Sequence, residues 1–243
     1  RTMQIAQKLY QGIEIEGETI GLITYMRTDG TNLSKDAVSS FRDYIQKEIG
    51  NEYLPKDALN YSGKKAKNAQ EAHEAIRPTD IIRTPQNIKK YLSTDQNKLY
   101  ELIWSKALSS QMESAKFDRN TITITSDNND TICKTSGSVL KFDGFLKIYN
   151  NQSKDDDESI LPSVSKGPIN IEALLDEQHY TQPPPRYSEA SLVKKLEELG
   201  IGRPSTYASI ISTIANRGYA EILNKRFFPT DRGKLISAFL EKL

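Results

Sequence analysis

The sequence predicts a multi-domain protein that is mainly α-helical and carries a β-rich segment in its middle. Three observations predict this fold class. Apolar residues recur at helical spacing over the first third, β-branched and polar residues alternate over the middle, and helical spacing returns in the last third.

The first domain opens on a helix. Ile5, Ala6, Leu9 and Tyr10 fall on one stripe of a helical pattern that is already under way at the first residue. No initiator methionine and no N-cap residue precede this pattern. We therefore expect the chain to be an internal segment of a longer protein.

A second helix is expected after Ser34, which is a good N-cap, and it should end at Gly50 in a left-handed cap. Its inward side chains at helical spacing are Val38, Phe41, Ile45 and Ile49. Further helices are expected near Pro85 and from about Thr94. The last of these should turn inward Leu99, Leu102, Ile103 and Ala107. The polar, Lys-rich residues 51–70 predict a surface loop.

The middle of the chain predicts antiparallel strands separated by polar turns. The expected strands are 121–125, 131–134, 139–149 with a break at Asp143-Gly144, and 169–175. The run of acidic residues at 155–158 predicts a solvated loop, because a polar stretch of one charge sign does not bury.

The last third begins with three prolines at 183–185, which favour an extended segment. Expected helix caps are Ser188, Ser205 and Thr230. The helix after Ser188 carries Leu192, Val193, Leu196 and Leu199; the next carries Ile210, Ile211 and Ile214; the last carries Leu235, Ile236 and Phe239. With a hairpin at 219–229, this order of helix, glycine turn, helix and hairpin predicts a winged-helix-like part.

Composition excludes several functional classes. The chain has 243 residues and a formal net charge of +1, so no polyelectrolyte attraction acts on the whole molecule, although residues 183–243 carry ten basic and six acidic side chains. One cysteine (Cys133) and two histidines (His73 and His179) exclude a disulfide framework and the usual Cys/His zinc site. No apolar run approaches the roughly 18 residues of a membrane span. We expect a cytoplasmic protein.

The densest group of chemically useful residues lies at 21–30, where a short apolar strand is expected to end in a turn. Tyr25 and Arg27 are two residues apart and therefore face the same side of an extended backbone. A phenol is a weak nucleophile at neutral pH, and a neighbouring cation favours its ionised form. The same guanidinium can bind phosphate oxygens and stabilise the charge that develops on phosphorus. The alternative is that the ring packs and the charge is merely solvated.

Two further groups contain basic and hydroxyl side chains. His73 and Arg77 lie in a short segment that ends at Pro78, where they can contact a phosphate; the alternative is a surface helical turn with a Glu74–Arg77 ion pair. The other group is Arg203, Ser205 and Thr206, which stand at an expected helix N-terminus, a natural phosphate site.

Other chemistry is not indicated by the sequence. No glycine-rich loop followed by Lys-Ser/Thr appears, so P-loop ATPase chemistry is excluded. No Glu with an Asp-x-Asp pair follows an apolar strand, where a two-metal site would be expected. We therefore assign no metal ligand to this chain.

At these groups the sequence resembles the type IA DNA topoisomerases, on the branch of the bacterial topoisomerase I enzymes. Three separated motifs occur in the order that is typical of the family. They are Ile23-Thr24-Tyr25-Met26-Arg27-Thr28-Asp29 with Thr31-Asn32-Leu33-Ser34, then Ala72-His73-Glu74-Ala75-Ile76-Arg77-Pro78-Thr79, then Tyr180 to Leu192 with Gly200-Ile201-Gly202-Arg203-Pro204-Ser205-Thr206-Tyr207-Ala208. Gly30 is a departure, since the family usually has Ser there.

The resemblance implies a role for each matched residue. Tyr25 would be the nucleophile that cleaves one DNA strand and keeps a 5′-phosphotyrosine link. Arg27 would position the phosphate, and His73 would contact DNA near it. Arg203, Ser205 and Thr206 would hold single-stranded DNA, and we add Arg77 to the DNA-binding residues.

The resemblance also implies an architecture and partners. Residues 1–112 would be the helical domain that bears the tyrosine, 113–181 part of a β-rich arch, and 182–243 part of a helical base. The family's metal-binding domain, which supplies Mg²⁺, and its zinc modules have no counterpart here, so these domains of the same polypeptide are expected partners. The substrate would be single-stranded or underwound DNA at the nucleoid. Two alternatives remain: a winged-helix DNA-binding module in which Tyr25 is structural, and an RNA-binding or regulatory scaffold.

Overall fold

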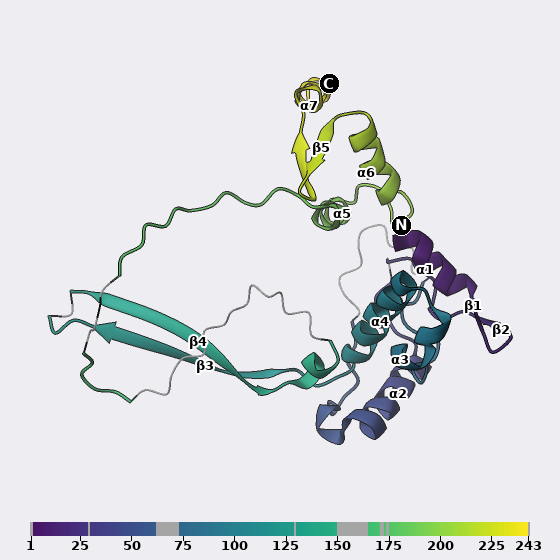
Figure 1. Ribbon diagram of the computed structural model, residues 1–243, viewed down its shortest axis with the longest axis horizontal. Helices are drawn as coiled ribbons and strands as arrows, with labels where there is room; N and C mark the ends of the chain where they lie inside the picture. The colour runs from purple at the N-terminus through teal and green to yellow at the C-terminus, as the bar shows by residue number, and fades with distance from the viewer. Residues whose placement is uncertain are drawn as a thin grey trace. The chain divides into compact units, whose positions relative to one another are not determined.

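The computed structural model describes residues 2–28, 30–61, 73–128, 130–149, 165–170, 173 and 175–242. They form two compact units that divide between Gly167 and Pro168. The described residues contain seven α-helices and three two-stranded antiparallel sheets (Figure 1). This content confirms a mainly α-helical protein with antiparallel β-structure. The three domain boundaries stay a prediction.

The first unit holds four of these helices and two of the sheets. The helices are α1 (Thr2–Gln11), α2 (Lys35–Tyr44), α3 (Pro85–Ile88) and α4 (Thr94–Ser109). Shorter turns are the π-helix η1 (Ile45–Ile49) and the 3₁₀-helices η2 (Asn51–Tyr53), η3 (Lys89–Tyr91) and η4 (Gly144–Lys147). The strands are β1 (Ile13–Ile15), β2 (Glu18–Ile20), β3 (Lys116–Thr125) and β4 (Ile132–Phe142).

The helices of the first unit start where capping chemistry predicts. The Ser34 side chain accepts from the backbone N–H of Ala37, which confirms it as the N-cap of α2. The C-terminal end of this helix differs from the prediction. α2 continues into the wider turn η1, and Gly50 has φ 136° and ψ 149°, which is a positive-φ extended conformation and not a left-handed helical cap.

One hydrophobic core fills the first unit. α1 contributes Ala6 and Leu9, and α2 contributes Phe41, which is 1% exposed. The stripe that α4 buries is Tyr100, Trp104, Ala107 and Leu108. The prediction that Leu102 faces inward is wrong: it is 50% exposed, because the aromatic residues Tyr100 and Trp104 turn the buried face of the helix away from it.

The sheets differ in part from the predicted strands. The β1–β2 hairpin was not predicted, and its turn has positive φ at Glu16 and Gly17. The expected apolar strand at 21–30 is wrong, since only Ile23 makes a bridge there, with Pro78. β3 and β4 form a longer ribbon than predicted, paired from Lys116 with Phe142 to Thr125 with Ile132 (Figure 1).

The segment 51–61 is only partly the predicted surface loop. Tyr53 is buried in the core cluster, and its ring packs against Phe142 at a centroid distance of 5.0 Å. Gln111 is fully buried and bonds through its amide to both backbone groups of Leu59. The rest of that predicted loop, 62–70, and the acidic run 155–158 lie outside the described residues.

The second unit contains α5 (Glu189–Glu198), α6 (Tyr207–Asn216), β5 (Ala220–Leu223), β6 (Arg226–Pro229) and α7 (Asp231–Leu240). Ser188 and Thr230 cap α5 and α7 as predicted. Ser205 does not cap α6, because the residue before that helix is Thr206. The predicted strand at 169–175 is wrong at its described positions 169, 170, 173 and 175, which have no strand partner; the others lie outside the described residues.

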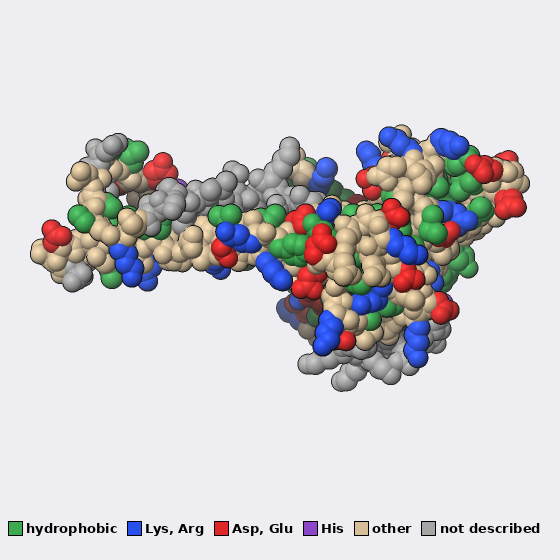
Figure 2. Space-filling view, turned by 90° about the horizontal axis from the view of Figure 1, so that it is seen from below, with side chains coloured by type: hydrophobic (Ala, Val, Ile, Leu, Met, Phe, Trp, Pro, Cys, Tyr) green, Lys and Arg blue, Asp and Glu red, His purple; other side chains and the backbone are tan. Residues whose placement is uncertain are grey.

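The second unit buries much less of its apolar surface. Of its described hydrophobic residues, Phe227 is the one that is buried, while Leu235 is 72% exposed. On the face drawn in Figure 2, basic and acidic side chains are interspersed, in keeping with the net charge of +1. Among the helices that the structure describes, none combines the length and apolar character needed to cross a membrane.

Candidate active site

The site is built from two stretches of chain that are distant in sequence. The segment 73–79 lies between residues 22–24 on one side and 32–34 on the other. The backbone N–H of Thr24 donates to the Arg77 carbonyl at 2.9 Å, and that of Thr79 donates to the Leu22 carbonyl at 3.0 Å. On the opposite side, the N–H of Ala75 donates to the carbonyl of Asn32 at 2.9 Å. The chain on both sides of Tyr25 is thereby tied to the segment that carries His73.

The side chain of Thr24 strengthens this attachment directly before Tyr25. Its hydroxyl donates to the Ala75 carbonyl at 2.8 Å and accepts from the backbone N–H of Arg77 at 3.0 Å. One hydroxyl thus satisfies two backbone groups on the facing segment. Together with the backbone bonds, it fixes the point at which Tyr25 leaves the paired region.

Tyr25 is accessible and stands between two other rings. Its side chain is 38% exposed. The ring lies 5.2 Å from the ring of Tyr10 on α1 in an edge-to-face contact, and 5.0 Å from the imidazole of His73. The hydroxyl-bearing ring is therefore held by neighbouring rings without being enclosed.

Arg27 and His73 are in direct contact. The Nη1 atom of Arg27 lies 3.2 Å from Nε2 of His73. A guanidinium can only donate, so Nε2 must be the acceptor and the ring proton must be on Nδ1. The structure therefore brings Tyr25, Arg27 and His73 together.

Gly30 allows a close approach in this region. A Cβ atom on residue 30 would collide with the carbonyl oxygen of His73. As packed here, the turn after Arg27 lies so close to His73 that it leaves no room for a side chain at residue 30. The sequence marks Gly30 as a departure from the family pattern but does not reveal this contact.

The segment around His73 is not the expected helical turn. Its described residues 73–79 form no helical turn; they bend at Ile76 and Thr79 and pair with both flanking stretches. Arg77 donates from Nε and Nη2 to the carboxylate of Glu74, at 2.7 and 3.0 Å, and from Nη1 to the carbonyl of Pro78. The ion pair that was the alternative for this segment is present, and a DNA contact by Arg77 stays a prediction.

The carboxyl of Glu74 titrates below its ordinary range. Partial burial alone would raise the pKa of Glu74. Hydrogen bonds from Arg77 and from the backbone N–H of Ser34, together with the charge of Arg77, lower the pKa by more than burial raises it. The ionised form is thus favoured by folding. Its contribution to stability is present above the usual glutamate pKa and is lost as the pH falls through the lowered value.

The third predicted group lies in the second unit. The Thr206 hydroxyl accepts from the backbone N–H of Arg203 at 2.8 Å and donates to its carbonyl at 3.0 Å, which closes a compact turn before α6. The Arg203 guanidinium donates to the carbonyl of Gly202. Arg203, Ser205 and Thr206 are all exposed. The turn is exposed and carries a cation and the hydroxyl of Ser205, while the hydroxyl of Thr206 bonds to the Arg203 backbone; the role of these residues in binding DNA stays a prediction.

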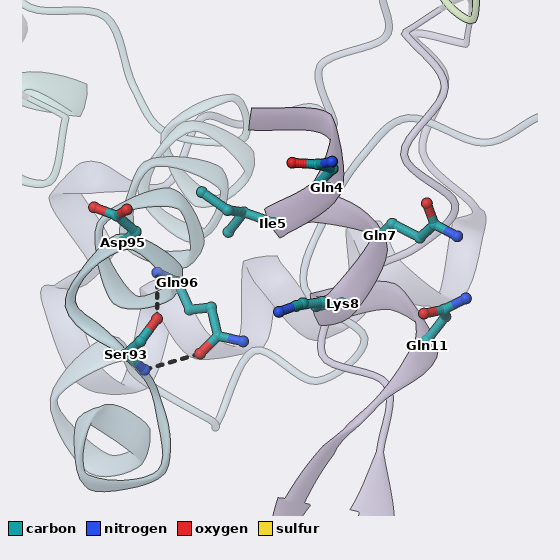
Figure 3. Close-up of a pocket in the computed structure, with 8 residues that line it drawn as sticks. All are labelled: Gln4, Ile5, Gln7, Lys8, Gln11, Ser93, Asp95 and Gln96. Atoms are coloured by element: carbon teal, nitrogen blue, oxygen red, sulfur yellow. Dashed lines mark hydrogen bonds between the residues drawn. The ribbon is translucent and has the colours of Figure 1, made fainter. Parts of the chain in front are cut away.

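A separate pocket of about 640 Å³ lies between α1 and the first turn of α4. Its lining residues are Gln4, Ile5, Gln7, Lys8, Gln11, Ser93, Asp95 and Gln96 (Figure 3). Figure 3 shows Lys8 pointing from α1 toward Ser93 and Gln96, which form the capping box of α4. Tyr25, Arg27 and His73 do not line this pocket. In the part of the chain that the structure describes, no three His, Cys, Asp or Glu side chains cluster closely enough to hold a metal ion.

Two neighbours of Tyr25 were not predicted as part of the site. Tyr10 was placed on one stripe of the first helix with Ile5, Ala6 and Leu9, but the residue is 42% exposed and its ring contacts Tyr25. Thr24 is part of the first motif, but no role was predicted for it. Helical periodicity places Tyr10 beside the core, but no local signal shows which distant ring it meets.

Comparisons with known proteins identify the family of the chain. The family model described as DNA topoisomerase matches residues 1–243. DNA topoisomerase 1 of Rickettsia typhi is 52% identical over 99% of this chain, and that of Xylella fastidiosa (strain 9a5c) is 49% identical over the same share. These alignments cover 31% and 30% of the two relatives, so the chain spans about a third of their length.

A solved structure is also similar to the chain. The full-length topoisomerase I from Thermotoga maritima superposes with a TM-score of 0.77 at 36% identity, over 99% of this chain and 38% of that one. The family model, the sequence relatives and the solved structure all indicate the same family. The chain belongs to the bacterial DNA topoisomerase family.

Proposed function

We propose that this chain carries the strand-cleaving centre of a type IA DNA topoisomerase, with Tyr25 as the nucleophile. The phenolic oxygen attacks a backbone phosphorus, so that a Tyr25–phosphate bond forms while the bond from phosphorus to the 3′-oxygen breaks. The phenolic proton leaves Tyr25, and the departing 3′-oxygen takes up a proton. Rejoining reverses these steps, so the energy of the phosphodiester is kept and ATP is not needed.

The observation that carries the proposal is the grouping of Tyr25, Arg27 and His73. The exposed ring of Tyr25 lies 5.0 Å from the ring of His73, whose Nε2 contacts the guanidinium of Arg27. A phosphate beside Tyr25 would meet the positive charge of Arg27, which stabilises negative charge on the equatorial oxygens in the transition state. With Nε2 accepting from Arg27, the Nδ1–H group of His73 is suited to donate a hydrogen bond to the phosphate.

We propose that DNA binding involves further residues. Arg203, Ser205 and Thr206 would bind the backbone of single-stranded or underwound DNA at the start of α6, and Arg77 would add a weaker contact. The support is chemical: exposed hydroxyls, a guanidinium and the N-terminus of a ten-residue helix are phosphate ligands. Such an enzyme would act on DNA at the nucleoid in the cytoplasm.

The proposed architecture follows the family. Residues 1–112 would be the domain that bears the tyrosine, 113–181 a part of the arch with the β3–β4 ribbon, and 182–243 a winged-helix-like part of the base. Relaxation of negative supercoils by strand passage would use the whole enzyme. Following the family resemblance, we assign Mg²⁺ to another domain of the enzyme and derive no step through it.

A binding module without catalysis is the second candidate. The order α5, α6, β5–β6 hairpin and α7 is that of a winged helix, and this observation favours DNA binding by the second unit whether or not Tyr25 reacts. The two candidates differ in one product. The topoisomerase reading predicts a covalent adduct between Tyr25 and DNA, and the binding-module reading predicts none.

The isolated chain is the simplest protein for a first test. We expect it to bind single-stranded DNA weakly and to leave supercoiled plasmid unrelaxed, because the proposed metal-binding domain is not part of it. Plasmid relaxation followed on gels with added Mg²⁺ measures this. Loss of supercoils in the presence of this chain alone would contradict the proposed division of labour.

A further inference from the structure

Glu74 follows His73 directly, and the proposed chemistry gives it no role. Its Oε1 atom accepts from the backbone N–H of Ser34 and from Nε of Arg77, both at 2.7 Å. Its Oε2 atom accepts from Nη2 of Arg77 at 3.0 Å. Each oxygen is thus used, and the three bonds join parts of the chain that lie up to 40 residues apart.

Both partners of the carboxylate are anchored themselves. Ser34 is the N-cap of α2, a helix whose Phe41 is in the core. Arg77 exchanges bonds with Thr24, which directly precedes Tyr25: its N–H donates to the Thr24 hydroxyl, and its carbonyl accepts from the Thr24 N–H. Glu74 therefore connects the start of α2 to the chain that enters the reactive ring.

We propose that Glu74 is a positioning residue, whose carboxylate holds the 73–77 segment against α2 and so places the His73 imidazole beside Tyr25 and Arg27. The geometric part of this proposal stands on the contacts of Glu74. Its consequence for DNA cleavage rests on the proposed function.

Several features separate Glu74 from an ordinary surface ion pair. The contact with Arg77 is bidentate, and the side chains of Arg77 and Glu74 are only 16% and 27% exposed. Bidentate, charge-assisted bonds are stronger and more directional than exposed pairs, which contribute little. A third donor comes from the backbone, and the lowered pKa of Glu74 agrees with a carboxylate stabilised by all of these donors.

The substitution Glu74→Gln tests the positioning role with little change in shape. The amide must turn an NH₂ group toward Ser34 or Arg77, both of which donate, so at least one of the three bonds is lost. Glu198→Gln is the matched control, because Glu198 also pairs with a cation three residues away, Lys195, but lies in the second unit. Glu74→Asp keeps the charge and shortens the reach.

The first readout does not depend on catalysis. The chain has two histidines, so a ¹H–¹³C NMR spectrum contains two imidazole Cε1–H signals. The substitution His179→Asn removes one of them and thereby assigns the other to His73. We expect Glu74→Gln to shift the His73 signal by more than its line width, Glu74→Asp to shift it less, and Glu198→Gln to leave it in place. A folded Glu74→Gln protein with an unmoved His73 signal, or an equal shift in the control, would overturn the proposal.

The second readout is cleavage of a labelled single-stranded oligonucleotide by a topoisomerase that carries this segment. A displacement of about 1 Å at a reacting group slows reactions by up to about 100-fold. We therefore expect the Glu74→Gln enzyme to cleave DNA about 10- to 100-fold more slowly than the wild type. Its affinity for DNA should change by less than about 2-fold, because the substitution displaces a reacting group and removes no proposed DNA contact. An unchanged cleavage rate despite a shifted His73 signal would overturn the catalytic consequence. Failure of the proposed function itself is distinguishable, because the wild type would then form no adduct, or Tyr25→Phe would form one as well.

Discussion

The two units place their functional side chains in different ways. In the first unit, the contact between Arg27 and His73 joins residues 46 apart, and the Thr24 hydroxyl bonds to groups 51 and 53 residues away. In the second unit, the turn at Arg203 is closed by bonds to Thr206, three residues on. The first site is made by tertiary structure, and the second by a local turn on the surface.

This difference matches what the proposed role of each site requires. A nucleophile and the groups that assist it must be held within fractions of an ångström, which requires support from a packed core. A residue that binds the backbone of a flexible strand needs exposure and charge more than a fixed position. The comparison predicts that the first site is sensitive to substitutions far from it, and that the second is sensitive mainly to its own side chains.

The largest expected effect is on stability. Phe41→Ala empties a position that is 1% exposed, and truncation of such a ring typically costs about 3–5 kcal/mol in the free energy of unfolding. Leu235→Ala, at a position 72% exposed in the second unit, should change it by less than about 0.5 kcal/mol. Urea denaturation followed by circular dichroism measures both. Equal losses would contradict the contrast between the units.

A smaller effect is expected at Gly30. Gly30→Ala adds a methyl group that meets the carbonyl of His73, so the turn must move, with a loss of about 1–3 kcal/mol and a shifted His73 NMR signal. Gly167→Ala is the matched control, because a Cβ there meets no atom within 4 Å. A Gly30→Ala protein with wild-type stability and an unmoved His73 signal would show that the close approach is not needed.

The smallest effect concerns binding by the second unit. If Arg203 contacts one phosphate, Arg203→Ala should reduce the slope of log K against log salt by about 0.7 for single-stranded DNA. The wild-type slope should be near −3 if about four phosphates are contacted. Lys234→Ala is the control, because Lys234 pairs with Asp231 on α7. Fluorescence anisotropy with a labelled oligonucleotide measures the slopes, and an unchanged slope in Arg203→Ala would remove this residue from the interface.

Much of the fold is predicted from local sequence, because caps and periodicity are local. Ser34, Ser188 and Thr230 accept the backbone N–H bonds expected of N-caps. Errors arise where distant partners decide. Leu102 fits the helical stripe, but the packing of Trp104 sets which face is buried, and the apolar residues 21–23 pair with the segment at 78 and not with a neighbouring strand.

The site shows the same division. Tyr25, Arg27 and His73 are recognised from motif residues, and the structure brings them together. Their supports are not predicted: Thr24, the Gly30 contact and the third bond of Glu74 depend on pairings across some 40 residues or more. A glutamate three residues before an arginine predicts an ion pair. The hydrogen bond from the Ser34 N–H to Glu74, which attaches this pair to the start of α2, has no signal in the local sequence.

The central claim is that the oxygen of Tyr25 forms a covalent bond with the DNA backbone. Tyr25→Phe, in a topoisomerase that carries this segment, removes that oxygen and leaves the ring between Tyr10 and His73. The oligonucleotide is single-stranded and carries its label in the fragment that has the 5′-phosphate after cleavage. The wild type should then yield a labelled protein–DNA adduct that survives denaturing electrophoresis. Tyr25→Phe should yield none while it binds the oligonucleotide with nearly unchanged affinity. An adduct formed by Tyr25→Phe would contradict the account.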